Sequence, residues 1–273
     1  MEDPANEQKV VEAHRTVIEP LWTEPLFAKV EEELPLAEEG TQLIAEARCG
    51  YLPIKLRGEL DDDIRVIALD PKRAMLDDAR NRGEDGEIEQ IFFIPERVDS
   101  ISYADGVFQS SICFDGMITS RQVKEGIEEL SRVTVDDGSI AVAAPFGSSF
   151  QLFYDMLDEA LRAHEMSERL GRIENLRESL LSPARLLAVA EEVGLDIDTI
   201  QKLDWTVSFE SGRDFLHSPL VRETFFPHWI GVVSSPKRDQ IVRYIGDAID
   251  TYWHDRPVET NVTAGFLVGR KGD

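Results

Sequence analysis

Three residues in the first third of the chain have the types and the spacing of a small-molecule site. Glu46 ends an apolar run, Gly50 follows it closely, and Asp70 ends a second apolar run twenty residues after Gly50. A glycine lets the backbone turn tightly beside a ligand, and an acid about twenty residues further on is the spacing of sites that bind ribose hydroxyls. The alternative is that Asp70 only caps the helix that Pro71 begins. The sequence leaves both interpretations of Asp70 open.

No arrangement of residues assigns a catalytic role. The side chains that could accept a proton lie outside any motif; they are His14, His164, His217, His228, His254, Tyr103 and Tyr154. Cys113 lies in an apolar run and is expected to be buried, whereas Cys49 lies in the first loop and is the thiol to test for exposure and reactivity. No Cys/His cluster has metal-ligand spacing. We therefore expect no metal and leave the catalytic residues unknown.

The elements that must position Glu46 and Asp70 alternate between strands and helices. Short apolar runs predict buried strands over residues 40–47, 63–70, 91–94, 107–114, 139–145, 197–203 and 261–269. Helical patterns lie between them at residues 52–60, 71–81, 121–133, 150–170 and 183–193. Continuously hydrophobic strands that alternate with helices are typical of a sheet covered on both faces. This pattern predicts a doubly wound, Rossmann-like α/β fold with a mostly parallel, seven-stranded sheet.

Two helical regions frame the expected sheet. Residues 1–38 form an N-terminal segment that Pro20 and Pro25 are expected to break into short helices. Residues 204–258 form a helical lid or insertion before the last strand and are rich in large aromatic side chains. Their spacing suits a substrate lid or a subdomain that packs on itself, and we favour the second. No internal repeat divides the chain, so we expect one domain over residues 1–273.

Taken in order, these segments resemble the class I S-adenosylmethionine-dependent methyltransferases of the type 11-like kind, from about Pro20 to Lys271. Residues 65–80 are similar to the family's second strand, its acid and the helix that follows. Residues 128–133 are similar to the helix that leads into the fifth strand, and residues 103–108 to the loop before the fourth. The resemblance implies S-adenosylmethionine as cofactor, held by Glu46, Gly50, Asp70 and Asp99.

Several residues depart from the pattern of this family, among them Gln109, which stands where the resemblance implies an Asp after Phe108. Arg48 and Leu52 stand where the resemblance implies glycines, and Arg97 stands where it implies an acid near the adenine, unless a shift of alignment brings Asp99 there. A tight turn at Arg48 requires a positive φ, which costs about 1 kcal/mol or more for a residue with a Cβ. We expect Arg48, Leu52 and Arg97 to alter the pocket and to make cofactor binding doubtful.

The departures also gather positive charge. Arg48 and Arg97 lie near the expected pocket mouth, with Lys55 and Arg57 on the adjoining helix. The arginines could fill the pocket and pair with Glu46 and Asp70. They could instead bind an anionic ligand, since a guanidinium suits carboxylate or phosphate, or they could be scattered surface residues with no shared role. The sequence leaves all three interpretations open.

The bulk composition excludes several partners. The net charge of −24 disfavours nucleic acid and anionic membranes, which require a basic footprint. A solvated acidic surface explains this charge, and an acidic face for a basic partner is the sharper hypothesis. No apolar stretch has the length of a membrane span, and the acidic, polar N-terminus does not resemble a signal peptide. We expect a cytoplasmic protein.

Together these observations predict a methyltransferase-like protein with impaired S-adenosylmethionine binding. It would act as a binding or scaffold subunit with a protein partner; the sequence leaves open whether it is an enzyme and favours that it is not. The first alternative is an active S-adenosylmethionine-dependent methyltransferase of a small molecule, with an atypical first loop. The second is a sensor of an anionic ligand at Arg48 and Arg97.

Overall fold

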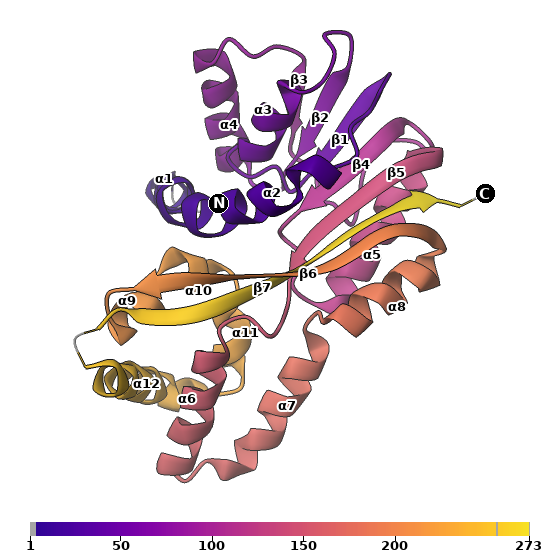
Figure 1. Cartoon of the computed structure of the whole chain (residues 1–273). Helices are drawn as coiled ribbons and strands as arrows, with labels where there is room; N and C mark the ends of the chain where they lie inside the picture. Colours follow the sequence, from indigo (N-terminus) through magenta and orange to yellow (C-terminus); the bar gives the residue numbers. More distant parts are fainter. Residues whose placement is uncertain (1–3, 255, 273) are drawn as a thin grey trace.

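Seven strands form one mixed sheet in the computed structural model, which describes residues 4–254 and 256–272 (Figure 1). The strands are β1 (Thr41–Ala45), β2 (Arg65–Leu69), β3 (Ile91–Ile94), β4 (Phe108–Phe114), β5 (Thr134–Pro145), β6 (Leu195–Phe209) and β7 (Val258–Lys271). Their order is β3-β2-β1-β4-β5-β7-β6, with β1 to β5 parallel and β7 antiparallel to both neighbours. The predicted α/β fold and the mostly parallel seven-stranded sheet are confirmed.

The central strands end at one edge of the sheet. Ala45 of β1 is in register with Leu69 of β2 and with Cys113 of β4. The residues that follow these three strands therefore meet at the same place. In doubly wound sheets this edge, where the strand order reverses, is where ligands bind.

Helices cover both faces of the sheet. They are α3 (Tyr51–Arg57), α4 (Arg73–Asp85), α5 (Ser120–Val133) and α8 (Pro183–Val193). Alternate residues of β1 belong to different hydrophobic clusters, since Ile44 packs in one and Leu43 in the other. Both faces of the central strands are thus buried, which explains their continuous hydrophobicity.

The N-terminal segment is one unbroken helical rod. It consists of α1 (Pro4–Ala13), a π-helical stretch (His14–Thr23), α2 (Glu24–Val30) and a 3₁₀ turn (Glu31–Glu33). The segment does consist of short helical pieces, one of which begins beside Pro25, but the expected break at Pro20 is wrong. Pro20 lies inside the π-helical stretch, whose wider turns make room for a proline ring, and Pro25 lies in the first turn of α2, where no N–H is needed.

A second lobe, which is mostly helical, lies around the end of β6 and the start of β7. The ends of β6 and β7 project as a two-stranded ribbon that pairs through Phe209 and Val258 (Figure 1). Helices α6 (Gln151–Ala163), α7 (Leu170–Ser179), α9 (Gly212–His217), α10 (Pro219–Glu223), α11 (Phe226–Gly231) and α12 (Arg238–Trp253) surround this ribbon. The expectation that helix begins at Asp204 is wrong, because β6 continues through Phe209.

Aromatic side chains hold the helical lobe together. The buried ones are Phe150, Phe153, Tyr154, Phe215, Phe225 and Trp229. The Trp229 ring stacks on Phe153 with 4.0 Å between centroids and on Phe225 with 5.6 Å. The insertion therefore packs on its own core and on α6. Among the described residues, no helix is long and apolar enough to cross a membrane.

Candidate functional site

The loop between β1 and α3 takes a conformation that L-residues rarely adopt. Glu46, Arg48 and Gly50 have φ values of 57°, 50° and 81°. The positive φ expected at Arg48 is confirmed. A Cβ on Gly50 would lie 2.8 Å from the Cβ of Ala79, so the loop also needs a glycine there to pack against α4.

The Arg48 side chain bridges the two acids of the expected cofactor site. Its Nη2 lies 3.1 Å from Oε2 of Glu46, and its Nη1 lies 3.6 Å from Oδ2 of Asp70. The Arg48 main-chain N–H also donates to Oδ2 of Asp70 at 3.1 Å. The guanidinium thus occupies the space between the ends of β1 and β2.

Asp70 is fully buried and uses both of its oxygens. Oδ2 accepts from Arg48, and Oδ1 accepts the N–H of Lys72 at 2.8 Å. Helix α4 begins at Arg73, after Lys72, so Asp70 closes the turn before the helix and does not cap it.

A third acid completes the cluster, and sequence reasoning missed it. Asp115 follows β4, is 7% exposed and has a φ of 78°. The next residue, Gly116, has a φ of 87°, and a Cβ there would lie 2.6 Å from the Glu46 carboxylate. The available signal was position alone, since both residues directly follow a strand whose end lies beside β1.

Three carboxylates therefore surround one guanidinium. Burial raises the pKa values of Glu46 and of Asp115, and the nearby Arg48 only partly opposes this rise. Burial works against the charge of Arg48, but Glu46, Asp70 and Asp115 outweigh it and raise the pKa of the guanidinium. Arg48 is therefore the cation on which this cluster depends at neutral pH.

Little space remains beside Arg48. The cavity at this edge measures about 200 Å³ and is lined by Glu46, Arg48, Pro71, Arg97, Val98, Asp99, Gly116, Met117 and Gln122. Sites for drug-sized ligands and cofactors usually measure about 300 to 1,000 Å³. The Arg48 side chain forms part of the wall of this cavity.

Comparison with solved structures identifies the fold of this chain. A protein from Bacillus halodurans C-125 assigned as a methyltransferase superposes with a TM-score of 0.59 at 13% identity, over 90% of this chain and 99% of its own. The YcgJ protein of Bacillus subtilis gives 0.59 at 14% identity, over 92% and 99%. The chain has the fold of the class I methyltransferases. Neither a known family profile nor a curated relative matches the sequence.

The same fold also carries other chemistry. The [4+2]-cyclase SpnF superposes with a TM-score of 0.55 at 15% identity, over 91% of this chain and 81% of its own. The methyltransferase fold therefore does not by itself identify a methyl transfer reaction.

Arg97 is engaged elsewhere in this methyltransferase fold. Its Nε and Nη2 donate to the two carboxylate oxygens of Asp99 at 2.8 and 2.6 Å, and its side chain is two-thirds exposed. Pairing of Arg97 with Glu46 or Asp70 is thus not seen. Asp99, expected as a cofactor ligand, lines the cavity but is held by Arg97.

The other substitutions lie away from the cavity. Leu52 packs in the main hydrophobic core at 4% exposure and does not line the cavity, contrary to the expectation that it intrudes there. Arg57 is buried and donates to the carbonyl oxygens of Glu89 and Leu60. The Lys55 ammonium lies 6.0 Å from the Tyr51 ring. Of the four basic residues expected at the pocket mouth, only Arg48 and Arg97 line the cavity.

The N-terminal helix shields this loop. Val11 of α1 packs against Cys49 and Met75, and the Cys49 Sγ lies 3.2 Å from the Met75 Sδ. Burial raises the pKa of Cys49 to about 12, so the expectation of an exposed, reactive thiol is wrong. Cys113 is buried, as predicted.

No histidine lies among the described lining residues of the cavity, and the groups there that could accept a proton are the carboxylates of Glu46 and Asp99. Among the histidines, His14 lies close enough to the Arg48 loop for the charges of Arg48 and Arg82 to act on it. It is buried, and its ring nitrogens find no partner among the described residues. Burial and nearby cations lower its pKa to about 3. In the described ranges no group of three potential ligands could hold a metal ion.

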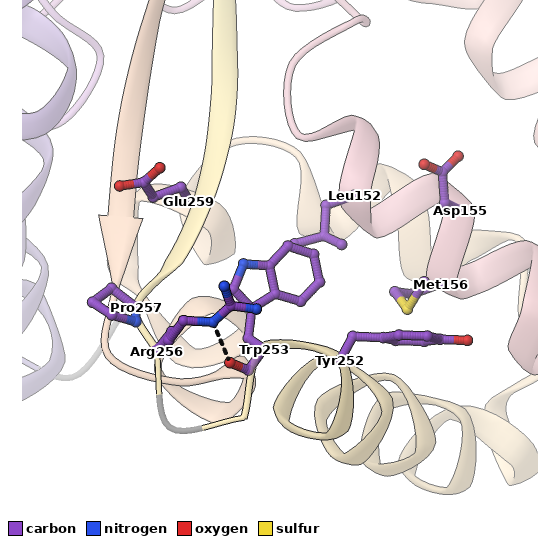
Figure 2. A pocket seen from close by; sticks show the side chains of 8 residues that line it. All are labelled: Leu152, Asp155, Met156, Tyr252, Trp253, Arg256, Pro257 and Glu259. Atoms are coloured by element: carbon purple, nitrogen blue, oxygen red, sulfur yellow. Dashed lines mark hydrogen bonds between the residues drawn. The ribbon is translucent and has the colours of Figure 1, made fainter.

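The helical lobe carries a separate, open pocket of about 680 Å³. Figure 2 shows Leu152 and Met156 of α6 facing Tyr252 and Trp253 at the end of α12. Asp155 and Glu259 bring carboxylates to its rim, while the Arg256 guanidinium donates to the carbonyl oxygen of Trp253. This surface is aromatic, partly acidic and distant in sequence from the Arg48 loop.

Proposed function

We propose that this chain is a methyltransferase-like protein in which Arg48 occupies the cofactor position, and that it acts as a binding or scaffold subunit. The observation that carries the proposal is the Arg48 guanidinium between Glu46 and Asp70. S-adenosylmethionine would have to displace this side chain. Doing so would leave buried carboxylates without their counter-ion, which is costly.

Charge as well as space supports the proposal. S-adenosylmethionine brings a sulfonium and an ammonium, and an acidic pocket suits these cations. Here Arg48 already supplies a cation from within the chain, so the cofactor would gain less from Glu46 and Asp70. The sensor alternative loses support for the same reason, since Arg48 and Arg97 are both paired with carboxylates.

A scaffold role would use the helical lobe. The pocket of Figure 2 combines half-exposed aromatic side chains with two carboxylates, Asp155 and Glu259, and one cation, Arg256. Such a surface suits a protein segment that carries basic and aromatic side chains. The cyclase SpnF is an example of this fold in a role other than methyl transfer.

The active enzyme remains the second candidate because of one observation. The Arg48 side chain is 22% exposed, so it could swing outward and leave Glu46, Gly50 and Asp70 in place for the cofactor. In that case Arg48 would act as a gate. The two candidates differ in whether the protein binds the cofactor at all.

Calorimetric titration with S-adenosylmethionine and S-adenosylhomocysteine separates the two candidates. We expect the unaltered protein to bind neither compound with a Kd below about 1 mM. Arg48→Gly should bind at least tenfold more tightly, because it removes the guanidinium from the cavity, and glycine also tolerates the positive φ at this position. Arg270→Gly, which removes an exposed arginine paired with Asp198, is the matched control and should change nothing. Micromolar binding by the unaltered protein would overturn the proposal.

Leu52→Ala separates a blocked pocket from a general loss of structure. Because Leu52 packs in the core, we expect this variant to lose about 2 to 5 kcal/mol of stability and to gain no cofactor binding. Cofactor binding by Leu52→Ala alone would mean that Leu52, and not Arg48, closes the site. Urea unfolding and the same calorimetric titration measure both effects.

A further inference from the structure

A groove along α12 gathers basic side chains in a chain that is strongly acidic. It measures about 650 Å³ and lies between α12 and the elements α9 to α11. Its basic lining residues are Arg213, His217, Arg222, Arg238 and Arg243, and its apolar ones are Leu216, Phe226, Ile230 and Val242. A volume of this size and a mixed apolar and charged lining are those of a small-molecule site.

The four arginines of this groove have no carboxylate partner in the described part of the chain. No acidic oxygen there lies within 4.0 Å of Arg213, Arg222, Arg238 or Arg243, whereas Arg48 and Arg82 each have one near 3 Å. Asp239, Asp247 and Asp250 also line the groove but form no such pair. The three carboxylates offset part of the positive charge of the groove, but none of them holds an arginine in an ion pair among the described residues.

Two of these guanidiniums are held in place by the backbone. Arg222 Nε donates to the carbonyl oxygen of Leu216 at 2.7 Å, and its guanidinium carbon lies 4.0 Å from the Phe226 ring centroid. Arg238 Nε donates to the carbonyl oxygen of Val233 at 3.1 Å. Each side chain keeps its terminal nitrogens uncommitted to carboxylates. Both are pre-organised, so binding of an anion costs less side-chain entropy.

The basic groups concentrate at one end of the groove. Gly212 donates its N–H to Asp250, and Leu216 lies against Gly246, so α9 runs antiparallel to α12. His217 and Arg222 therefore lie toward the N-terminal end of α12, where Arg238 begins this sixteen-residue helix. The helix dipole adds positive potential there. Partial burial lowers the pKa of Arg222, as expected for a cation without a counter-ion.

We propose that this groove binds a small organic anion with an apolar body. The carboxylate or phosphate head would lie between Arg222 and Arg238, and the apolar part would lie against Ile230 and Val242, which are partly exposed. This site is separate from the Arg48 cluster and does not depend on whether the cofactor binds. The ligand would carry the same sign of charge as the protein as a whole, so the arginines of the groove must supply the attraction.

Calorimetric titrations at pH 7.5 and 0.15 M KCl test the chemistry of the ligand. Salt at this concentration screens the net negative charge of the chain beyond about 8 Å. We expect octyl phosphate or octanoate to bind at least tenfold more tightly than inorganic phosphate, and octyltrimethylammonium to bind no better than inorganic phosphate. Equal binding of the cationic and anionic octyl probes would overturn the proposal, and so would no binding of either anion.

Variants locate the binding. Arg222→Gln and Arg238→Gln should each weaken binding of octyl phosphate at least tenfold, the scale of one lost charge-assisted hydrogen bond. Arg243→Glu, which replaces an exposed side chain, keeps the test valid if the other two variants unfold, and it should also weaken binding. Arg172→Glu, an exposed arginine of α7 outside the groove, is the control for net charge. Unchanged affinity in Arg243→Glu together with a folded, unchanged Arg222→Gln would place the ligand elsewhere.

Discussion

The two arginine sites of this molecule differ in what surrounds their guanidinium groups. Arg48 lies among Glu46, Asp70 and Asp115 at the edge of the parallel sheet, and its charge is matched from within the chain. Arg222 and Arg238 lie in the helical lobe and are held by backbone carbonyl oxygens, with no carboxylate partner in the described ranges. The first site is complete without a ligand, and the second is complete only with an anion.

An arginine near a pocket can therefore have either of two opposite effects on ligand binding. Where buried acids outnumber the arginine, as around Arg48, the side chain acts as a built-in counter-ion and excludes other cations. Where the arginine is positioned by carbonyl oxygens, it attracts anions. The nearest carboxylates, and not the arginine itself, decide which case applies.

The largest expected effect is on stability. Arg48→Ala should lower the free energy of unfolding by about 3 kcal/mol, because it leaves Asp70 and Glu46 buried without a counter-ion. Arg243→Ala in the groove should change it by less than about 0.5 kcal/mol. Urea unfolding of both variants at pH 7.5 measures the difference. Equal losses in the two variants would break the comparison between a matched and an unmatched arginine.

A smaller effect depends on pH. Burial raises the folded-state pKa of Asp115 above its ordinary value of 3.8, so the fold loses stability as the pH rises from that ordinary value through the folded-state pKa, and the penalty persists at higher pH. Asp115→Asn removes this penalty, and we expect the variant to gain stability over the unaltered protein between pH 5 and pH 8, on the order of 1 kcal/mol.

Thermal unfolding across this pH range checks the prediction. The exposed pair of Arg162 and Asp158 supplies the control, since Asp158→Asn should show no comparable gain with rising pH. A loss of stability in Asp115→Asn that grows with pH would mean that Asp115 is needed as a charged partner of Arg48.

The fold could be predicted from the sequence because the central strands are continuously hydrophobic. The end of β6 was missed although its signal was present, since Trp205, Val207 and Phe209 alternate with polar residues as in a half-buried strand. The π-helical stretch around Pro20 was also missed, since a proline normally ends a helix.

The candidate site could be predicted in part. Glu46, Arg48 and Asp70 do come together, because they follow neighbouring parallel strands. Leu52 and Cys49 were misplaced, because only long-range packing decides that Leu52 faces the core and that α1 covers Cys49. Asp115 was not found, since its role depends on the register between β1 and β4.

The smallest expected effect concerns salt, and it extends the comparison from two sites to two lobes. Residues 212–253 contain five basic and five acidic residues, so the net charge of −24 resides in the rest of the chain. Mutual repulsion therefore acts mainly on the sheet lobe, and salt weakens it. Raising KCl from 0.1 to 1 M should raise the unfolding temperature by about 3 °C or more. Hydrogen exchange should show that amide protection increases more in β1 to β5 than in α9 to α12. An equal increase in both lobes would show instead that salt acts through burial of apolar surface, which is common to both.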